Sequence, residues 1–204
     1  MRKTWDAIKA TLAQFLLIVF SVVLGLYLSD RIEERKKAQE ASALLSVIEA
    51  EVAENMSLFD YWAPYHQRVW LKLDSLSRDA AFVEQFVNER TILFPTLLAE
   101  RGTLMGRTPT SDAWDIAKSH PLTVNIDYHK LIALSRVYNQ QASTLEPMFD
   151  MFDLYNSSSV NAEVEAAANL KLMAERLREL VKREEQLMYY FAHADTTLGL
   201  QRYR

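Results

Sequence analysis

The side chains that could carry out acid–base or metal chemistry are few, and their spacing fits no catalytic pattern. The chain has four histidines, His66, His120, His129 and His193, and no cysteine. A di-iron site in a helical protein needs a glutamate three residues before a histidine, so that both project from adjacent turns. None of the four histidines has one. Without cysteine, thiolate zinc sites and iron–sulfur clusters are also excluded, and we predict neither a metal nor a cofactor.

Nucleophilic hydrolysis finds no better support in the sequence. A Gly-x-Ser-x-Gly turn is missing, and Ser119 beside His120 cannot form a triad hydrogen bond through adjacency alone. Glu184 and Glu185 are neighbouring carboxylates, but they lie in a segment rich in arginine and lysine. We interpret them as part of a solvated charged face. We therefore predict that the chain is not an enzyme.

An uncharged apolar segment runs from Leu12 to Leu28 near the start of the chain. As a helix it would be about 26 Å long, close to the thickness of the hydrocarbon core of a membrane. It is long for the apolar region of a signal peptide, and no small-x-small cleavage site follows it. We therefore expect an uncleaved transmembrane helix with membrane lipid as its surroundings. The net charge of −4 argues against a nucleic-acid partner.

Small and polar residues recur on one face of this segment, at Gln14, Ser21, Gly25 and Ser29. Small side chains at four-residue spacing let a second membrane helix approach closely, and a glutamine can hydrogen-bond across such a contact. We predict a packing face for another transmembrane helix. The same residues are also common in transmembrane helices without any such role.

The basic residues that flank the segment decide little about its orientation. Three precede it (Arg2, Lys3 and Lys9) and four follow it (Arg31, Arg35, Lys36 and Lys37). The positive-inside rule counts these residues, so its bias is small here. We expect the N-terminus in the cytoplasm and the larger part of the chain on the periplasmic side of a bacterial inner membrane.

Beyond the membrane segment the spacing of apolar residues predicts helices throughout. No glycine or proline occurs between Asp30 and Ala63, so that stretch can continue the membrane helix, with a heptad-like apolar seam. Pro64 predicts a kink or a new helix start. After a loop at 102–110, we expect a short helix that is capped by Thr110 or Ser111 and ends near His120. A long helical segment follows, capped by Asn125 or Asp127 and extending to 156 with a kink at Pro147, and then a last helix over 161–195.

These elements define the predicted fold class. We expect an all-α protein in which an N-terminal transmembrane helix precedes an antiparallel bundle of three to four long helices, with a short capping helix. Residues 1–30 would form the tail and anchor, and residues 31–204 the stalk and bundle domain.

Aromatic residues provide the candidate contact surface of that domain. Trp62, Tyr65 and Trp70 lie close together around Pro64, and Trp114 follows the glycine loop. Such rings can line a ligand pocket or a partner surface. They can equally form the core at a corner between helices, with Trp114 closing one end of the bundle.

Three segments together resemble a bacterial family of single-pass membrane-anchored helical proteins catalogued only as a domain of unknown function. They are the charged run after the span, the segment around Trp114 and the helix after it, with sequences SDRIEERKK (29–37), DAWDIAKS (112–119) and DYHKLIALSRVYN (127–139). Members usually carry asparagine and tryptophan just after the span, where Arg31 and Ile32 stand here. The resemblance implies an anchored helical domain and supplies no catalytic residues.

The function we expect is that of a non-catalytic accessory or assembly subunit of a larger inner-membrane complex, such as a respiratory or photosynthetic one. Its partners would be other membrane-protein subunits, contacted through the span and the bundle. The alternative is a membrane-anchored sensor or ligand-binding bundle with its pocket among the four rings named above. A homo-oligomeric scaffold that pairs through the heptad seam is a third hypothesis.

Overall fold

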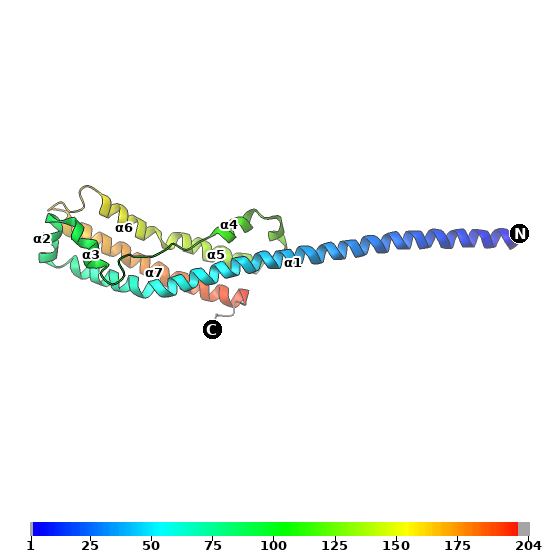
Figure 1. Cartoon of the computed structure of the whole chain (residues 1–204), viewed down its shortest axis with the longest axis horizontal. Coiled ribbons are helices and arrows are strands. Elements are labelled where there is room, and N and C mark those ends of the chain that lie inside the picture. Colours follow the sequence, from blue (N-terminus) through cyan, green and yellow to red (C-terminus); the bar gives the residue numbers. More distant parts are fainter. Residues whose placement is uncertain (1, 200–204) are drawn as a thin grey trace.

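The computed structural model describes residues 2–199, with side chains from residue 14 onward. All regular structure in this part of the chain is helical. Figure 1 shows a single long helix that extends from an elongated helical body. In chain order the elements are α1 (Arg2–Leu76), α2 (Ala80–Asn88), η1 (Arg90–Ile92), α3 (Leu93–Leu97), α4 (Asp112–Ser119), η2 (Pro121–Asn125), α5 (Tyr128–Thr144), α6 (Glu146–Asn156) and α7 (Ala166–Leu198).

Helix α1 joins the apolar segment to the body without a break. It spans 75 residues and includes Pro64 in its interior. The prediction of a new helix start at Pro64 was therefore wrong, and the expected continuation from Asp30 to Ala63 is confirmed. A proline removes one backbone hydrogen bond, and here the packing of α1 against α7 on both sides of it keeps the helix continuous.

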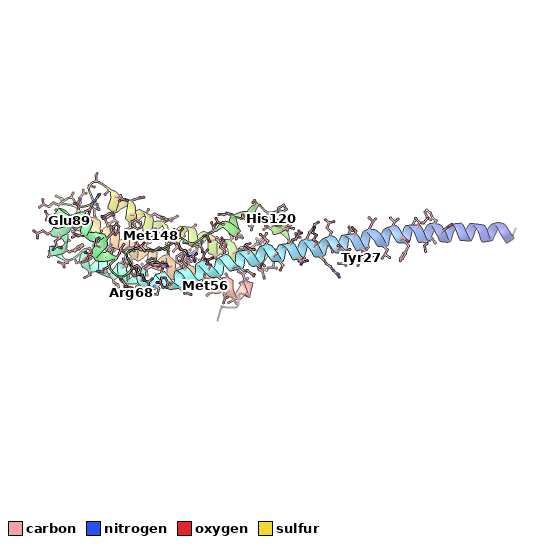
Figure 2. The ribbon with its side chains drawn as sticks, in the orientation of Figure 1. Tyr27, Met56, Arg68, Glu89, His120 and Met148 are labelled. Carbon is pink, nitrogen blue, oxygen red and sulfur yellow. The ribbon has the colours of Figure 1, made fainter. Side chains whose placement is uncertain are left out.

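The N-terminal part of α1 projects from the body without contacts to the rest of the described chain. Every residue from Gln14 to Glu40 is exposed, and Ala41 is the first buried residue of the helix. By length and composition this helix can cross a membrane. In Figure 2, Tyr27 lies on the projecting part, whereas Met56 and Arg68 lie where α1 runs along the body.

Helix α7 packs along α1 in the antiparallel direction. The Phe59 and Phe191 ring centroids lie 6.2 Å apart, and two turns further along α1 His66 Nδ1 lies 2.5 Å from Glu184 Oε1. Because the α1 number rises as the α7 number falls, the two helices run in opposite directions. The buried residues of α7 repeat at three- and four-residue spacing, as in Leu170, Met173, Leu177 and Leu180, which is the stripe expected of a core-facing helix.

Helices α5 and α6 cover another side of α7 and are also antiparallel to it. Arg183 Nη1 contacts Glu146 Oε2 at 2.7 Å, and Arg176 Nε lies 3.7 Å from Asp150 Oδ2. The helical segment predicted to extend to 156 is interrupted at Leu145, two residues before Pro147, and Pro147 lies in the first turn of α6. A proline is readily accommodated there because the first N–H groups of a helix have no partner within it.

Local signals set several other boundaries. Asp127 caps α5, as its side chain accepts hydrogen bonds from the amides of His129 and Lys130. Helix α4 begins at Asp112 and ends at Ser119, as predicted. Helix α7 begins at Ala166 and ends at Leu198, both later than predicted. Its C-cap residue, Gly199, has a φ of 71°, the left-handed conformation that glycine adopts readily.

Candidate functional site

The predicted transmembrane packing face lies on the projecting part of α1. Gln14, Ser21, Gly25 and Ser29 are all exposed. The Ser21 hydroxyl donates a hydrogen bond to the Leu17 carbonyl of the same helix at 2.7 Å, and a side chain added at Gly25 would meet nothing within 4 Å. No other part of the described chain covers this face. Its contact with a second helix stays a prediction.

The four predicted aromatic residues occupy two separate places in the body. Trp62 and Tyr65 are buried together, with ring centroids 5.8 Å apart in an edge-to-face arrangement. Trp114 is buried against α5, where its ring stacks on Tyr138 at 5.3 Å. Trp70 is half-buried against the hydrophobic core. The structure therefore brings Trp62 and Tyr65 together and packs Trp114 elsewhere.

Arg101 occupies the space beside the first of these aromatic groups. Its guanidinium carbon lies 4.2 Å from the Tyr61 ring centroid, 5.0 Å from that of Trp62 and 4.9 Å from that of Tyr65. A guanidinium over aromatic faces is attracted by their negative potential. The aromatic cluster near Pro64 is thus occupied by Arg101, a cation of the same chain. The sequence analysis did not predict this contact, because Arg101 is distant from the cluster in the sequence.

Arg101 belongs to an extended segment, Leu98–Ser111, which we call the strap and which joins α3 to α4. The strap lies along α1, and side chains of α1 hold it there. The Asn55 amide donates to the Thr110 carbonyl at 2.7 Å and accepts from the Thr110 amide at 3.1 Å. Arg107 Nη1 lies 2.5 Å from Glu54 Oε1.

The helix that follows the strap is tied to the same face of α1. Glu51 Oε2 accepts from the Ala113 amide in the first turn of α4 at 3.0 Å, and its Oε1 accepts from the Tyr138 hydroxyl at 2.6 Å. Burial, followed by the hydrogen bond to Glu51, raises the pKa of Tyr138. One carboxylate on α1 therefore joins α4 and α5. Ser111 is the N-cap residue of α4, but its hydroxyl donates to Asp115 Oδ2 and not to the cap.

A histidine–glutamate pair lies in the centre of the body, between α1 and α7. His66 and Glu184 are both 0% exposed, and His66 Nδ1 lies 2.5 Å from Glu184 Oε1. The Nε2 of His66 lies 2.8 Å from the Leu104 carbonyl of the strap. Since a carbonyl can only accept, Nε2 carries a proton, and a second proton must lie between Nδ1 and Oε1.

This pair overturns part of the interpretation of the acidic residues. Glu185 is exposed, as expected for a solvated face, but Glu184 is not. Burial raises the pKa of Glu184, and the hydrogen bond to His66 opposes that shift. The sequence carries a weak signal for the difference, since Glu184 follows Leu177, Leu180 and Val181 at helical spacing and so falls on the apolar stripe.

Glu184 also lines a cavity between α1 and α7. This cavity has a volume of about 410 Å³ and is lined by Phe59, Asp60, Ala63, Pro64, Gln67, Val181, Glu184, Glu185 and Met188. A second cavity of about 720 Å³ lies beside α2 and the start of α7. Neither is lined by Trp62, Tyr65, Trp70 or Trp114. Between residues 14 and 199 no group of three or more histidine, aspartate or glutamate side chains is placed to hold a metal ion.

Comparison with known proteins adds no further constraint. No family model, curated protein or solved structure matches the chain. The class of protein is therefore defined by the fold alone: an all-α protein with one long apolar N-terminal helix that can cross a membrane.

Proposed function

We propose that this protein is a non-catalytic accessory or assembly subunit of a larger inner-membrane complex. A single helix would anchor it, and its water-side body would be an antiparallel bundle of three to four long helices on the periplasmic side. The observation that carries the proposal is that α1 continues unbroken from an uncovered apolar segment into the packed body.

The environment of the apolar segment supports the anchor. Large apolar side chains are exposed all around this part of α1, including Phe15 at 61%, Phe20 at 65% and Leu26 at 62%. A contiguous apolar surface of this extent is unfavourable in water. Within lipid the same helix satisfies its backbone internally and places these side chains in hydrocarbon.

The continuity of α1 supports a positioning role. From Leu28 to Glu40 the helix would hold the body about 18 Å above the apolar segment. The exposed ion pairs Lys37–Glu33 and Arg31–Glu34 lie on this stretch. A flexible linker would leave the body free to reorient, whereas a helix fixes it relative to any neighbour bound by the span.

The anchor can be tested with a charge placed in the apolar segment. Phe20→Asp should move the protein from carbonate-washed membranes to the soluble fraction, because an aspartate near the centre of a span costs about 3 kcal/mol. Val47→Asp is the matched control, since Val47 is an exposed apolar residue of α1 beyond the projecting part. Membrane retention of both variants would contradict the anchor.

The partner can be tested on the packing face. Gly25→Leu should abolish migration of the full chain with a larger complex in native electrophoresis after extraction in mild detergent, because leucine prevents close helix approach. Val23→Leu, on the opposite side of the helix, should leave the complex intact. Migration of the unmodified protein as a monomer would contradict the proposal.

A further inference from the structure

The cavity between α1 and α7 combines an apolar interior with an unusual set of polar groups. Its buried lining residues are Phe59, Val181 and Glu184, and Asp60 and Glu185 are exposed at its rim. The lining contains three carboxyl groups and no lysine, arginine or histidine. Glu184 shares a proton with His66, so the negative charge at the cavity comes from Asp60 and Glu185, and the lining offers more hydrogen-bond acceptors than donors.

One of these acceptors is buried without a partner. Glu184 Oε1 bonds to His66, but Glu184 Oε2 has no hydrogen-bond partner in the described part of the chain. A buried carboxylate oxygen without a partner carries a desolvation cost that a donor would offset. His66, itself held by the Leu104 carbonyl, fixes the carboxylate in place.

Pro64 leaves a backbone acceptor, the carbonyl of Asp60, without its helical donor beside this cavity. It lies inside α1 and has no N–H to give to the carbonyl of Asp60, four residues earlier. Both residues line the cavity. The Pro64 carbonyl, by contrast, accepts from Arg68 Nη1 at 2.9 Å. The proline thus leaves the Asp60 carbonyl without its helical donor, at a residue that lines the cavity.

We propose that this cavity binds a small organic ammonium ion. The ammonium group would donate to Glu184 at the buried end and to the acceptors around Asp60, and its short apolar body would contact Phe59, Val181 and Met188. A volume of about 410 Å³ lies within the usual range of small-molecule sites. Met188 is half-buried and unbranched, so it can change rotamer to admit the ligand.

An ammonium ion fits these groups better than the alternatives. An anion would meet the charged carboxylates of Asp60 and Glu185, and a neutral apolar molecule would leave Glu184 Oε2 without a donor. A bare metal ion would need several convergent oxygen ligands, and the apolar walls of the cavity do not supply them. The inference does not depend on the proposed anchor or complex, because the cavity lies wholly within the body.

The test uses three probes of equal size and different charge. The full-length protein, in micelles of a detergent with an uncharged sugar headgroup, is titrated with n-butylammonium, n-butanol and butyrate in a calorimeter. We expect saturable one-to-one binding of n-butylammonium, with affinity at least tenfold higher than for n-butanol and no binding of butyrate. Equal affinity for n-butylammonium and n-butanol, or no saturable binding of the ammonium, would overturn the proposal.

Variants assign the binding to this cavity. Glu184→Gln keeps the shape of the side chain and should weaken n-butylammonium binding at least tenfold. Asp60→Asn, at an exposed position that cannot disturb the core, should weaken it threefold or more. Glu175→Gln is the matched control on the same helix outside the cavity. Unchanged affinity in Asp60→Asn and in folded Glu184→Gln would place the ligand elsewhere and contradict the assignment.

Discussion

Glu184 and His66 share two protons among three positions: the His66 Nε2, the His66 Nδ1 and the Glu184 carboxyl. Both hydrogen bonds of the imidazole, to Glu184 and to the Leu104 carbonyl, are satisfied only while both protons are present. Loss of one would set two acceptors against each other, either beside Glu184 or beside the strap. A single buried carboxyl group therefore helps to hold the strap on α1.

The raised pKa of Glu184 makes this contribution depend on pH. Because burial raises the pKa above its ordinary value of 4.5, the folded state binds the proton more tightly than the unfolded state does. The stabilisation is complete below the ordinary pKa and is lost as the pH rises through the raised pKa. The ion-paired carboxyl groups of Glu100 and Glu179 have lowered pKa values and give the opposite pH dependence.

We predict that Glu184→Gln removes this pH dependence. The glutamine amide can donate to His66 Nδ1 as the protonated carboxyl does, so the variant should be about as stable as the unmodified protein near pH 5. At pH 8 it should be more stable, by about 1.4 kcal/mol for each unit by which the pKa is raised. Urea unfolding at both pH values measures the difference in the free energy of unfolding between the variant and the unmodified protein. The other carboxyl groups are present in both proteins, so their effects cancel in this difference. The prediction would be contradicted if the stability of the variant, measured relative to the unmodified protein, were lower at pH 8 than at pH 5.

At the scale of elements, α1 tolerates a proline in its interior. Pro64 removes a backbone hydrogen bond, yet the helix continues to Leu76. On either side of it Phe59, Tyr65 and Val69 are buried in the core. The packing of these side chains outweighs the local preference of proline to end a helix.

We predict that Pro64→Ala increases the free energy of unfolding by about 1 to 3 kcal/mol, because alanine restores the missing hydrogen bond and favours the helix. Chemical denaturation of the full chain in detergent measures this. Pro121→Ala is the control, since Pro121 begins η2, where a backbone N–H has no helical partner. A loss of stability in Pro64→Ala would indicate that the proline is needed for the path of α1.

At the scale of the whole molecule, the projecting part of α1 and the body form one continuous object (Figure 1). His120 lies at the end of the body nearest the projecting part, and Glu89 lies at the far end (Figure 2). The strap, α4 and α5 all contact the part of α1 between Glu51 and His66. The body is therefore assembled around the same helix that leads into the apolar segment.

We predict a narrow distance distribution between spin labels at Ile32 and Val47. Both residues are exposed, and the chain has no native cysteine to interfere with labelling. A continuous helix separates their backbones by about 23 Å. The pair Val47 and Leu71, about 36 Å apart on the same helix, serves as the internal reference. Pulsed electron resonance on the full chain in lipid nanodiscs gives both distances, and a broad distribution for the first pair alone would mean a flexible joint.

Much of the fold follows from local patterns in the sequence. The uncharged stretch from Leu12 to Leu28, the absence of glycine and proline from Asp30 to Ala63 and the cap at Asp127 each act over a few residues. Hydrophobic periodicity and capping operate over the same short range. They determined the all-α class, the long apolar helix and the bounds of α4.

The tertiary structure alone decided which residues meet. Pro64 lies inside a helix because distant core contacts outweigh its local preference, and Glu184 is buried because α1 brings His66 opposite to it. Arg101 lies among aromatic rings from α1 only because the strap folds back along that helix. Each of these outcomes depends on an interaction between segments far apart in the chain. The spacing of neighbouring residues shows at most that Glu184 lies on an apolar stripe, and does not show which residue it meets.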